Sequence, residues 1–204
     1  MNTSNYRIER VDKNTCKEFL LKHHYLSRQG YGFRSGYNYG LFEGDKLIGV
    51  AIFHTVSAWQ TVKGCFGLEN KEQEGFYELG RLAMDSECKV PNLTSWFLAK
   101  AMKLLRQEVH PRAIITYADA EYHHGYIYQA CNFTYHGLTS PKSDFFVQQP
   151  DGSYRKQSRG KTKGIEGGEW RPRSQKHRYL KVYDKKLKTL WPQLPYPKGN
   201  NTEY

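Results

Sequence analysis

The chain of 204 residues lacks several features that would define its class at once. No apolar run approaches the roughly 20 residues needed to cross a bilayer. The first residues, Met-Asn-Thr-Ser-Asn, contain neither the charged nor the apolar region of a signal peptide. We therefore expect a cytoplasmic protein without a membrane partner.

Cysteine is also scarce, and it never occurs as a C-x-x-C pair. This spacing excludes both a zinc knuckle and a disulfide framework, and it predicts reduced, buried thiols. The cysteines are Cys16, Cys65, Cys88 and Cys131.

Positive charge, by contrast, is abundant and unevenly placed. The formal net charge is +11 and the pI is near 9.4. Residues 1–150 hold 17 Lys/Arg against 15 Asp/Glu, whereas residues 151–204 hold 14 against 5. We expect one domain, with a catalytic core over residues 1–150 and a basic extension over residues 151–204 packed on it.

The apolar patterns predict the order β–α–β–β–β–α–β–α–β, followed by the extension. Leu98, Met102 and Leu105 mark the buried face of the longest helix, which runs from Asn92 or Thr94 to Val109. A capping box at Thr15-x-x-Glu18 predicts the start of a first helix that ends near His23. Strands are expected at residues 6–11, 37–42, 47–54, 77–84, 114–118, from 133, 145–149, 154–156 and 177–183, and loops at residues 29–38, 63–75 and 158–169 and from 192 onward.

Titratable residues crowd into residues 114–137, where three histidines and five tyrosines occur within 24 residues. Asp119 ends an apolar strand, and Tyr128 lies on the short helix that follows. Ligands of open α/β sheets bind at such strand ends, so this segment predicts a site at a sheet edge.

The predicted element order resembles the GNAT acyltransferase fold, a mixed central sheet with splayed fourth and fifth strands. In that family the opened strands receive the pantetheine arm of the cofactor, and the following helix offers its N-terminus to the pyrophosphate. The glycine-rich signature of the family, Q/R-x-x-G-x-G/A, is replaced here by residues 85–95. The resemblance implies that the cofactor contacts Arg81, Leu82, Ala83, Met84, Asn92, Thr94 and Ser95.

GNAT proteins often carry A-x-x-x-Y-x-x-x-G-F after the fifth strand. Here Tyr128 occupies the position of the tyrosine and Asn132 replaces the glycine. The resemblance implies that Tyr128 is the general acid that protonates the departing thiolate.

A narrower resemblance is to the Mom proteins of bacteriophages. It rests on Glu78-Leu-Gly-Arg-Leu-Ala-Met84, Pro91-Asn-Leu-Thr-Ser95, Tyr117-Ala-Asp119, His124-Gly125 with Ile127-Tyr128-Gln-Ala130, and Ser174-Gln-Lys-His-Arg-Tyr-Leu180, and it covers roughly residues 15–183.

The Mom resemblance implies an enzyme that adds a methylcarbamoyl group to adenine N6 in double-stranded phage DNA and so protects it from host restriction. It implies acetyl-CoA as the acyl donor, suggests iron, and places the protein in the host cell cytoplasm. It also puts His24, Tyr25 and Asp119 on the acceptor side of the site, with His24 and Asp119 as candidate iron ligands.

The basic extension predicts contact with DNA, because Lys and Arg neutralise phosphates and aromatic side chains stack on bases. A loop over residues 25–39 is a candidate wall for an extruded base. The expected DNA contacts are Arg159, Lys161, Lys163, Arg171, Arg173, Lys176, His177 and Arg178.

Structural alternatives remain for several residues. Asp119 could cap the helix carrying Tyr128, His23 and His24 could complement a helix dipole, and Arg81 could be an exposed or salt-bridged arginine. Glu78 is an alternative base, and at most one of His123 and His124 is expected in the site.

Two other functions compete with DNA modification. One is an ordinary GNAT N-acetyltransferase acting on RNA, protein or a small amine. The other is a catalytically inactive DNA-binding protein.

Overall fold

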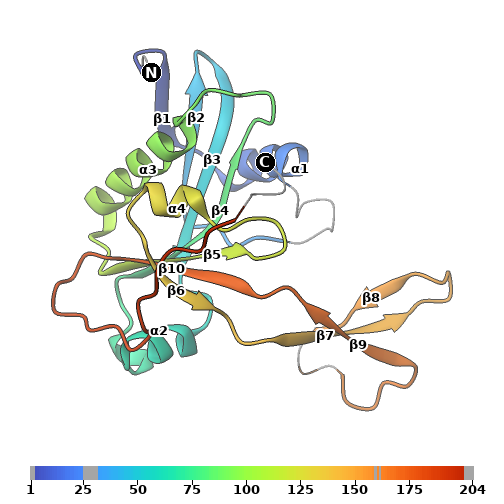
Figure 1. Ribbon diagram of the computed structural model, residues 1–204. Coiled ribbons are helices and arrows are strands. Elements are labelled where there is room, and N and C mark those ends of the chain that lie inside the picture. The colour runs from blue at the N-terminus through green and yellow to red at the C-terminus, as the bar shows by residue number, and fades with distance from the viewer. Residues whose placement is uncertain (1–2, 25–31, 159, 161, 200–204) are drawn as a thin grey trace.

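The computed structural model describes residues 3–24, 32–158, 160 and 162–199. Its centre is a seven-stranded mixed sheet in which every neighbouring pair is antiparallel except β4 with β5 (Figure 1). The strand order is β1 (Tyr6–Arg10), β2 (Tyr37–Glu43), β3 (Lys46–Thr55), β4 (Phe76–Met84), β5 (Ala113–Asp119), β10 (Lys176–Val182) and β6 (Thr134–Leu138).

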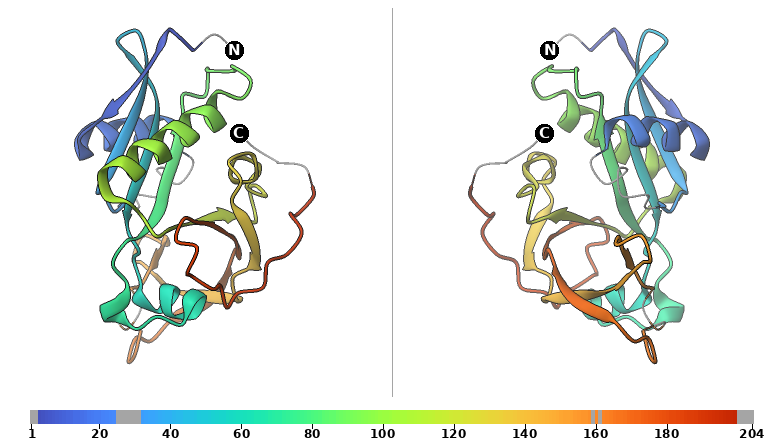
Figure 2. Two further views of the ribbon diagram at one scale, coloured as in Figure 1. Left: turned by 90° about the vertical axis from the view of Figure 1, so that its left-hand side faces the viewer. Right: turned by 90° about the vertical axis from the view of Figure 1, so that its right-hand side faces the viewer.

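Helices cover both faces of this sheet (Figure 2). On one face α3 (Leu93–Val109) and α4 (Tyr126–Ala130) pack into the main core. On the other face lie α1 (Lys13–His23) and α2 (Trp59–Phe66). The α/β architecture of a GNAT-like mixed sheet flanked by helices, expected from the sequence, is confirmed.

Side chains at helical spacing explain why α3 forms and how it packs. Its predicted face is buried, with Leu98 and Leu105 fully inaccessible and Met102 at 5% exposure. Asn92 occupies the N-cap position with a left-handed φ of 61°, and its side chain makes no capping bond.

Two local predictions were wrong. The cap of α1 is Asp12, whose carboxylate accepts hydrogen bonds from the amides of Asn14 and Thr15 at 2.7 and 3.0 Å, so the helix starts before the expected capping box. Residues 63–75, expected to be a loop, contain the end of α2 and the short 3-10 helix η2 (Asn70–Glu72). Helix α2 is too short for a clear periodic signal, but it buries Val62, Cys65 and Phe66.

The strands β4 and β5 pair over only part of their length. Their parallel register runs from Phe76 opposite Ala113 to Leu79 opposite Thr116. Beyond that point β4 continues to Met84 beside β3, whereas β5 continues to Asp119 beside β10. The two strands therefore part after Leu79 and Thr116, and we call this point the fork.

A second, three-stranded sheet stands away from the central one (Figure 1). It has the order β8 (Tyr154–Lys156), β7 (Lys142–Gln148) and β9 (Gly168–Arg173). We call residues 139–175, which include this sheet, the arm. The structure does not divide at residue 150, because β10 returns from the arm into the middle of the central sheet.

Residues 192–199, expected to be a loop, contact β6 and the residue before it. Leu194 forms a bridge with Tyr135 of β6, and the Tyr196 hydroxyl donates to the Phe133 carbonyl at 2.7 Å. All four cysteines are free, and three of them are buried, as expected. Within the described ranges the helices are all too short or too polar to cross a membrane.

Candidate functional site

The fork is the geometric centre of the candidate site. The Thr116 hydroxyl donates to the Leu79 carbonyl at 3.0 Å, which closes the last rung between the parting strands. Tyr128 of α4 lies against this rung. Burial raises the pKa of its phenol, while a hydrogen bond with Thr116 and the nearby positive charge of Arg81 lower it. The phenol is therefore protonated at neutral pH and sits where β4 and β5 separate.

Arg81, on the splayed part of β4, links the groups around the opening. Its guanidinium donates to the Gly80 carbonyl at 2.7 Å. Its charge acts on His24, Tyr128 and Lys176, lowering the pKa of each. Arg81 is partly buried among titratable groups rather than exposed, and the alternative of a salt-bridged arginine stays open.

His24 and His123 lie close enough for the charge of His123 to act on His24. Burial, together with Arg81 and His123, lowers the pKa of His24 to about 4. Burial also lowers the pKa of His123, against the carboxylate of Asp119, which raises it. Both imidazoles are neutral near pH 7, so each can accept a proton or a hydrogen bond.

Each pair of adjacent histidines divides between two environments. The Nδ1 atom of His23 lies 3.6 Å from Oδ1 of the buried Asp85. The His124 side chain lies against β10, where its Nδ1 is 3.3 Å from Nε2 of His177. His123 is thus the histidine of its pair that enters the site.

Asp119 lies at the end of β5, directly opposite Lys176 of β10. The lysine Nζ is 3.9 Å from the Asp119 carboxylate. Burial lowers the pKa of Lys176, and Asp119 opposes that effect. Asp119 is not the cap of α4, whose N-cap is Gly125; instead its Oδ1 accepts the amide of Glu121 at 3.2 Å.

Glu78, the alternative base, also reaches this cluster. Its charge raises the pKa of Lys176 and that of Tyr117. It lies before the fork, on the part of β4 still paired with β5.

The start of α3 provides free backbone amides near the splayed end of β4. The first four N–H groups of any helix lack an intrahelical partner, and they include those of Thr94 and Ser95. The Ser95 hydroxyl donates to the Asn92 carbonyl at 2.9 Å, and the Cys131 thiol donates to the Ser95 carbonyl at 3.4 Å. The second contact ties the end of α4 to the start of α3.

The preceding connection is built around a carboxylate rather than glycines. Asp85 pairs with Lys46 at 2.9 Å and accepts the Glu87 amide at 3.1 Å, and the Lys46 contact lowers the pKa of Asp85.

A buried chain of polar groups runs beside the site. The Tyr135 hydroxyl lies 2.8 Å from Nδ1 of His177, whose Nε2 faces His124. Burial and the neighbouring histidines lower the pKa of His177 to about 4. This side chain is only 6% exposed, so it lies inside the protein and not on the DNA-contacting surface expected from the sequence.

The arm is anchored next to Asp119. The amide of Ala120 donates to the Gln175 carbonyl at 3.0 Å, and the amide of Lys176 donates to the Thr139 hydroxyl at 3.0 Å. These contacts hold both ends of the arm against the strand end that carries Asp119.

Two positively charged residues lie opposite each other at the base of the arm, where both of its ends join the central sheet. Lys142 of β7 lies directly opposite Arg173 of β9, and no ion pair to either is found in the described parts of the chain. Directly opposed like charges destabilise a sheet unless an anion lies between or over them. Arg171, two residues earlier, pairs with Glu169 and lies over the rings of Tyr154 and Phe146 at 3.9 and 5.0 Å from their centroids.

The remaining expected DNA contacts are spread over different surroundings. Lys163 is exposed on the loop before β9. Arg178 lies over the Trp191 ring at 4.4 Å, on β10 rather than on the arm. Tyr25, Arg159 and Lys161 lie outside the described residues, as do residues 25–31 of the loop proposed as a base wall.

The described residues do not provide a site for iron. Within them, no three His, Cys, Asp or Glu side chains gather closely enough to hold a metal ion. His24 and Asp119 therefore lack a third ligand of these types there.

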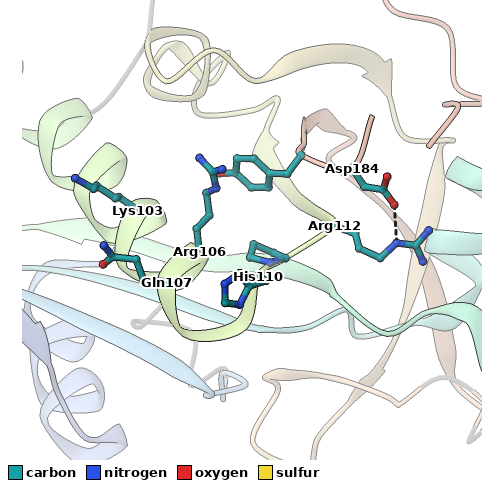
Figure 3. A pocket seen from close by; sticks show the side chains of 8 residues that line it. Lys103, Arg106, Gln107, His110, Arg112 and Asp184 are labelled. Carbon is teal, nitrogen blue, oxygen red and sulfur yellow. Dashed lines mark hydrogen bonds and ion pairs between the residues drawn. The ribbon is translucent and has the colours of Figure 1, made fainter. Parts of the chain in front are cut away.

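A hollow of about 530 Å³ lies elsewhere, at the C-terminal end of α3 (Figure 3). Figure 3 shows that Lys103 and Arg112 point in different directions, and Arg112 is paired with Asp184 at 3.0 Å. Arg106 lies over the Tyr183 ring at 4.5 Å. Because these cations do not converge, we assign no site there.

Sequence reasoning missed Thr116, left open which of His123 and His124 enters the site, and read Lys176 as a DNA contact only. The usable signal for Lys176 was its position at the start of the last strand, but the antiparallel pairing that brings it to Asp119 is a tertiary fact.

Comparison with known proteins agrees with the fold. The profile of the Mom protein family matches residues 5–198. No curated protein matches the chain significantly.

Solved acetyltransferases share the architecture at low sequence identity. The ribosomal-protein-S5-alanine acetyltransferase from Vibrio fischeri is 9% identical, over 94% of this chain and 98% of its own, with a TM-score of 0.52. The IAA acetyltransferase from Bacillus cereus is 15% identical, over 87% and 99%, with a TM-score of 0.51. An N-acetyltransferase from Staphylococcus aureus is 12% identical, over 88% and 99%, with a TM-score of 0.50.

Proposed function

The chain belongs to the Mom protein family, and from that premise we propose that it is an acyl-CoA-dependent transferase that modifies adenine N6 in double-stranded DNA. The observation that carries the proposal is the fork. An opening between two strands has Tyr128 at its base, and it is bordered by His24, Arg81 and Asp119.

The donor side is the opening between β4 and β5. Residues 81–84 of β4 pair with β3 on one edge and face the opening with the other, so their backbone groups can hydrogen-bond the amides of a pantetheine arm. The amides of Thr94 and Ser95 at the start of α3 suit the pyrophosphate. Acetyl-CoA, when bound, supplies a thioester carbonyl at the fork.

The acceptor side is the cluster around Asp119. Adenine N6 is a weak nucleophile, so it must lose a proton as it attacks. His24 is neutral at physiological pH and can accept that proton, while Asp119 can orient the amine through a hydrogen bond. The lone pair of N6 forms the new bond to the carbonyl carbon, and the carbon–sulfur bond breaks.

The leaving thiolate needs a proton, and Tyr128 can provide it. Its phenol is protonated at neutral pH because burial raises its pKa. A thiolate formed at the fork would lie within the reach of this hydroxyl.

The transfer proposed here joins N6 to the carbonyl carbon of the acetyl group and therefore gives an N6-acetyl product. A methylcarbamoyl group carries one more nitrogen, between its methyl and carbonyl carbons, and this step does not supply it.

The arm supports DNA as the acceptor. Its base carries Lys142 and Arg173, which have no ion pair among the described residues, and it is fixed beside Asp119, so a phosphate backbone bound there would lie next to the site. Protection of phage DNA from host restriction would follow from a modified adenine that an endonuclease cannot read.

Mass spectrometry of nucleosides from cells expressing the protein tests the proposal. We expect a modified deoxyadenosine whose acyl carbons derive from labelled acetate, and we expect its loss in Asp119→Asn. Unaltered deoxyadenosine together with acetylated RNA, protein or small amines would instead identify an ordinary N-acetyltransferase. Unaltered DNA with retained DNA binding would identify an inactive DNA-binding protein.

A further inference from the structure

The arm has two chemically different faces. Side chains alternate along a strand, so Lys142, Asp144 and Phe146 of β7 share one face with Arg171 and Arg173 of β9. The opposite face carries Phe145, Val147 and Trp170. One face is therefore basic, and the other is apolar and aromatic.

Trp170 is the most unusual residue of the aromatic face. Its exposure is 62%, although an indole is among the side chains that gain most from burial. It stands on β9, an edge strand, and its ring centroid lies 5.1 Å from that of Phe145.

Trp170 packs against a buried aromatic ring. Phe145 is one of the few buried residues of the arm, at 8% exposure. Gly168 permits this packing, since a Cβ at that position would collide with the Phe145 ring. The indole is thus held in place by a packed ring while its other face stays open.

A small hollow of about 110 Å³ with a mixed polar and apolar lining borders the indole. Its polar lining residues are Ser143, Asp144, Gln157 and Thr162. Hydroxyl and amide groups beside an exposed aromatic ring are what a nucleobase needs, because the ring stacks on its face and the polar groups bond its edge.

We propose that Trp170 and this hollow form a second nucleobase subsite, which stacks on a base unpaired while the target adenine is drawn into the fork. This inference rests on the proposed function, because it takes DNA as the acceptor. Extrusion of a base from a duplex leaves neighbours unpaired, and an aromatic side chain that stacks on one offsets the lost stacking. Trp170 and Lys176 are six positions apart in the chain, so they lie at most about 20 Å from each other.

Equilibrium binding of Trp170→Ala and Trp170→Phe to two duplexes tests the subsite. One duplex is fully paired, and the other carries a single mismatched base beside the target adenine. We expect Trp170→Ala to bind the mismatched duplex about 5- to 100-fold more weakly than wild type, with partial retention in Trp170→Phe. The dependence of log K on log salt should stay unchanged, because no phosphate contact is lost.

The matched control is Trp59→Ala, which removes a second partly exposed indole from α2 on the central sheet. It should bind both duplexes like wild type. Photocrosslinking with 5-iodouracil at the mismatched position should label the peptide containing Trp170 in the wild-type protein.

The outcomes separate the two proposals. Equal affinity of wild type and Trp170→Ala for the mismatched duplex, with crosslinks elsewhere, would overturn the subsite and leave DNA modification standing. A wild-type protein that binds neither duplex would overturn both. Thermal melts that match wild type would establish that Trp170→Ala is folded.

Discussion

The fork and the arm differ in how deeply their charged and titratable groups are buried. Around the fork, titratable groups are buried together, and the pKa values of His24, His123 and Lys176 all fall below their ordinary range. On the arm, Lys142 and Arg155 are exposed, and Trp170 stands in solvent. Titratable groups that are buried away from water interact electrostatically with one another, whereas groups exposed to water remain available to bind a partner.

This difference separates two kinds of expected damage. Changes at the fork should alter the rate of reaction with little effect on DNA affinity. Changes on the arm should alter affinity and its salt dependence with little effect on the rate at saturating DNA.

Asp119→Asn should produce the largest effect at the fork. The amide keeps the shape of the side chain but loses the charge beside His123 and Lys176, so we expect a loss of about 1000-fold in kcat/KM for DNA modification. Glu121→Gln, on the exposed turn that follows, is the control and should retain activity. Equal activity of Asp119→Asn and wild type, measured as modified deoxyadenosine per unit time, would remove Asp119 from the mechanism.

Tyr128→Phe should follow, with a loss of about 100-fold in kcat and an unchanged KM for the donor. The ring remains packed in the core and only the hydroxyl beside Thr116 is lost. Tyr126→Phe, on the exposed side of the same helix, serves as the control. A rise in KM alone would show that the phenol binds the donor without transferring a proton.

The double variant Lys142→Glu and Arg173→Glu should weaken duplex binding about 10- to 100-fold and reduce the slope of log K against log salt by roughly 2. Lys103→Glu with Lys186→Glu makes the same charge change away from the arm and should affect both quantities less. Filter binding over a range of salt concentrations measures them. Indistinguishable slopes for the two double variants would mean that positive charge acts only through the net field of the protein.

The smallest expected effect concerns stability. The pKa of His177 is about 4 in the folded protein and near 6.5 when unfolded, so the unfolded chain binds more protons between these values. Stability should therefore fall as the pH drops from about 6.5 to 4, and it should be flat above that window as far as this group is concerned.

His177→Gln replaces the neutral imidazole with a group that cannot titrate. The substitution should reduce the loss of unfolding free energy between about pH 6.5 and 4 by on the order of 2 kcal/mol. Denaturant unfolding at several pH values measures this loss. The exposed His110→Gln should leave the pH profile as it is in wild type. If the unfolding free energy of His177→Gln depends on pH in the same way as that of wild type, His177 is not the group that titrates.

Much of the fold was predictable because its signals are local. The apolar face of α3, the hairpin of β2 and β3 and the β5–α4–β6 unit follow from periodicity and turn residues within short windows. Helix α2 was missed because eight residues with a glycine and polar side chains give no clear period. The start of α1 was misplaced because Asp12 competes successfully with Thr15 for the cap.

The candidate site was predictable only in part. Asp119 and Tyr128 could be named because each has a characteristic place relative to a strand or helix. The family resemblance singled out His24 of the first histidine pair, but the choice between His123 and His124 could not be made, since neighbours along the chain point in different directions that packing alone selects.

The sequence by itself determined the strands and helices, the concentration of positive charge after residue 150 and the family to which the chain belongs, because these depend on residue order over short distances. The tertiary structure alone decided that β10 returns between β5 and β6 and brings Lys176 opposite Asp119. That pairing also fixes the arm beside the fork. Contacts between residues far apart in the chain leave no periodic trace, so only the folded sheet reveals them.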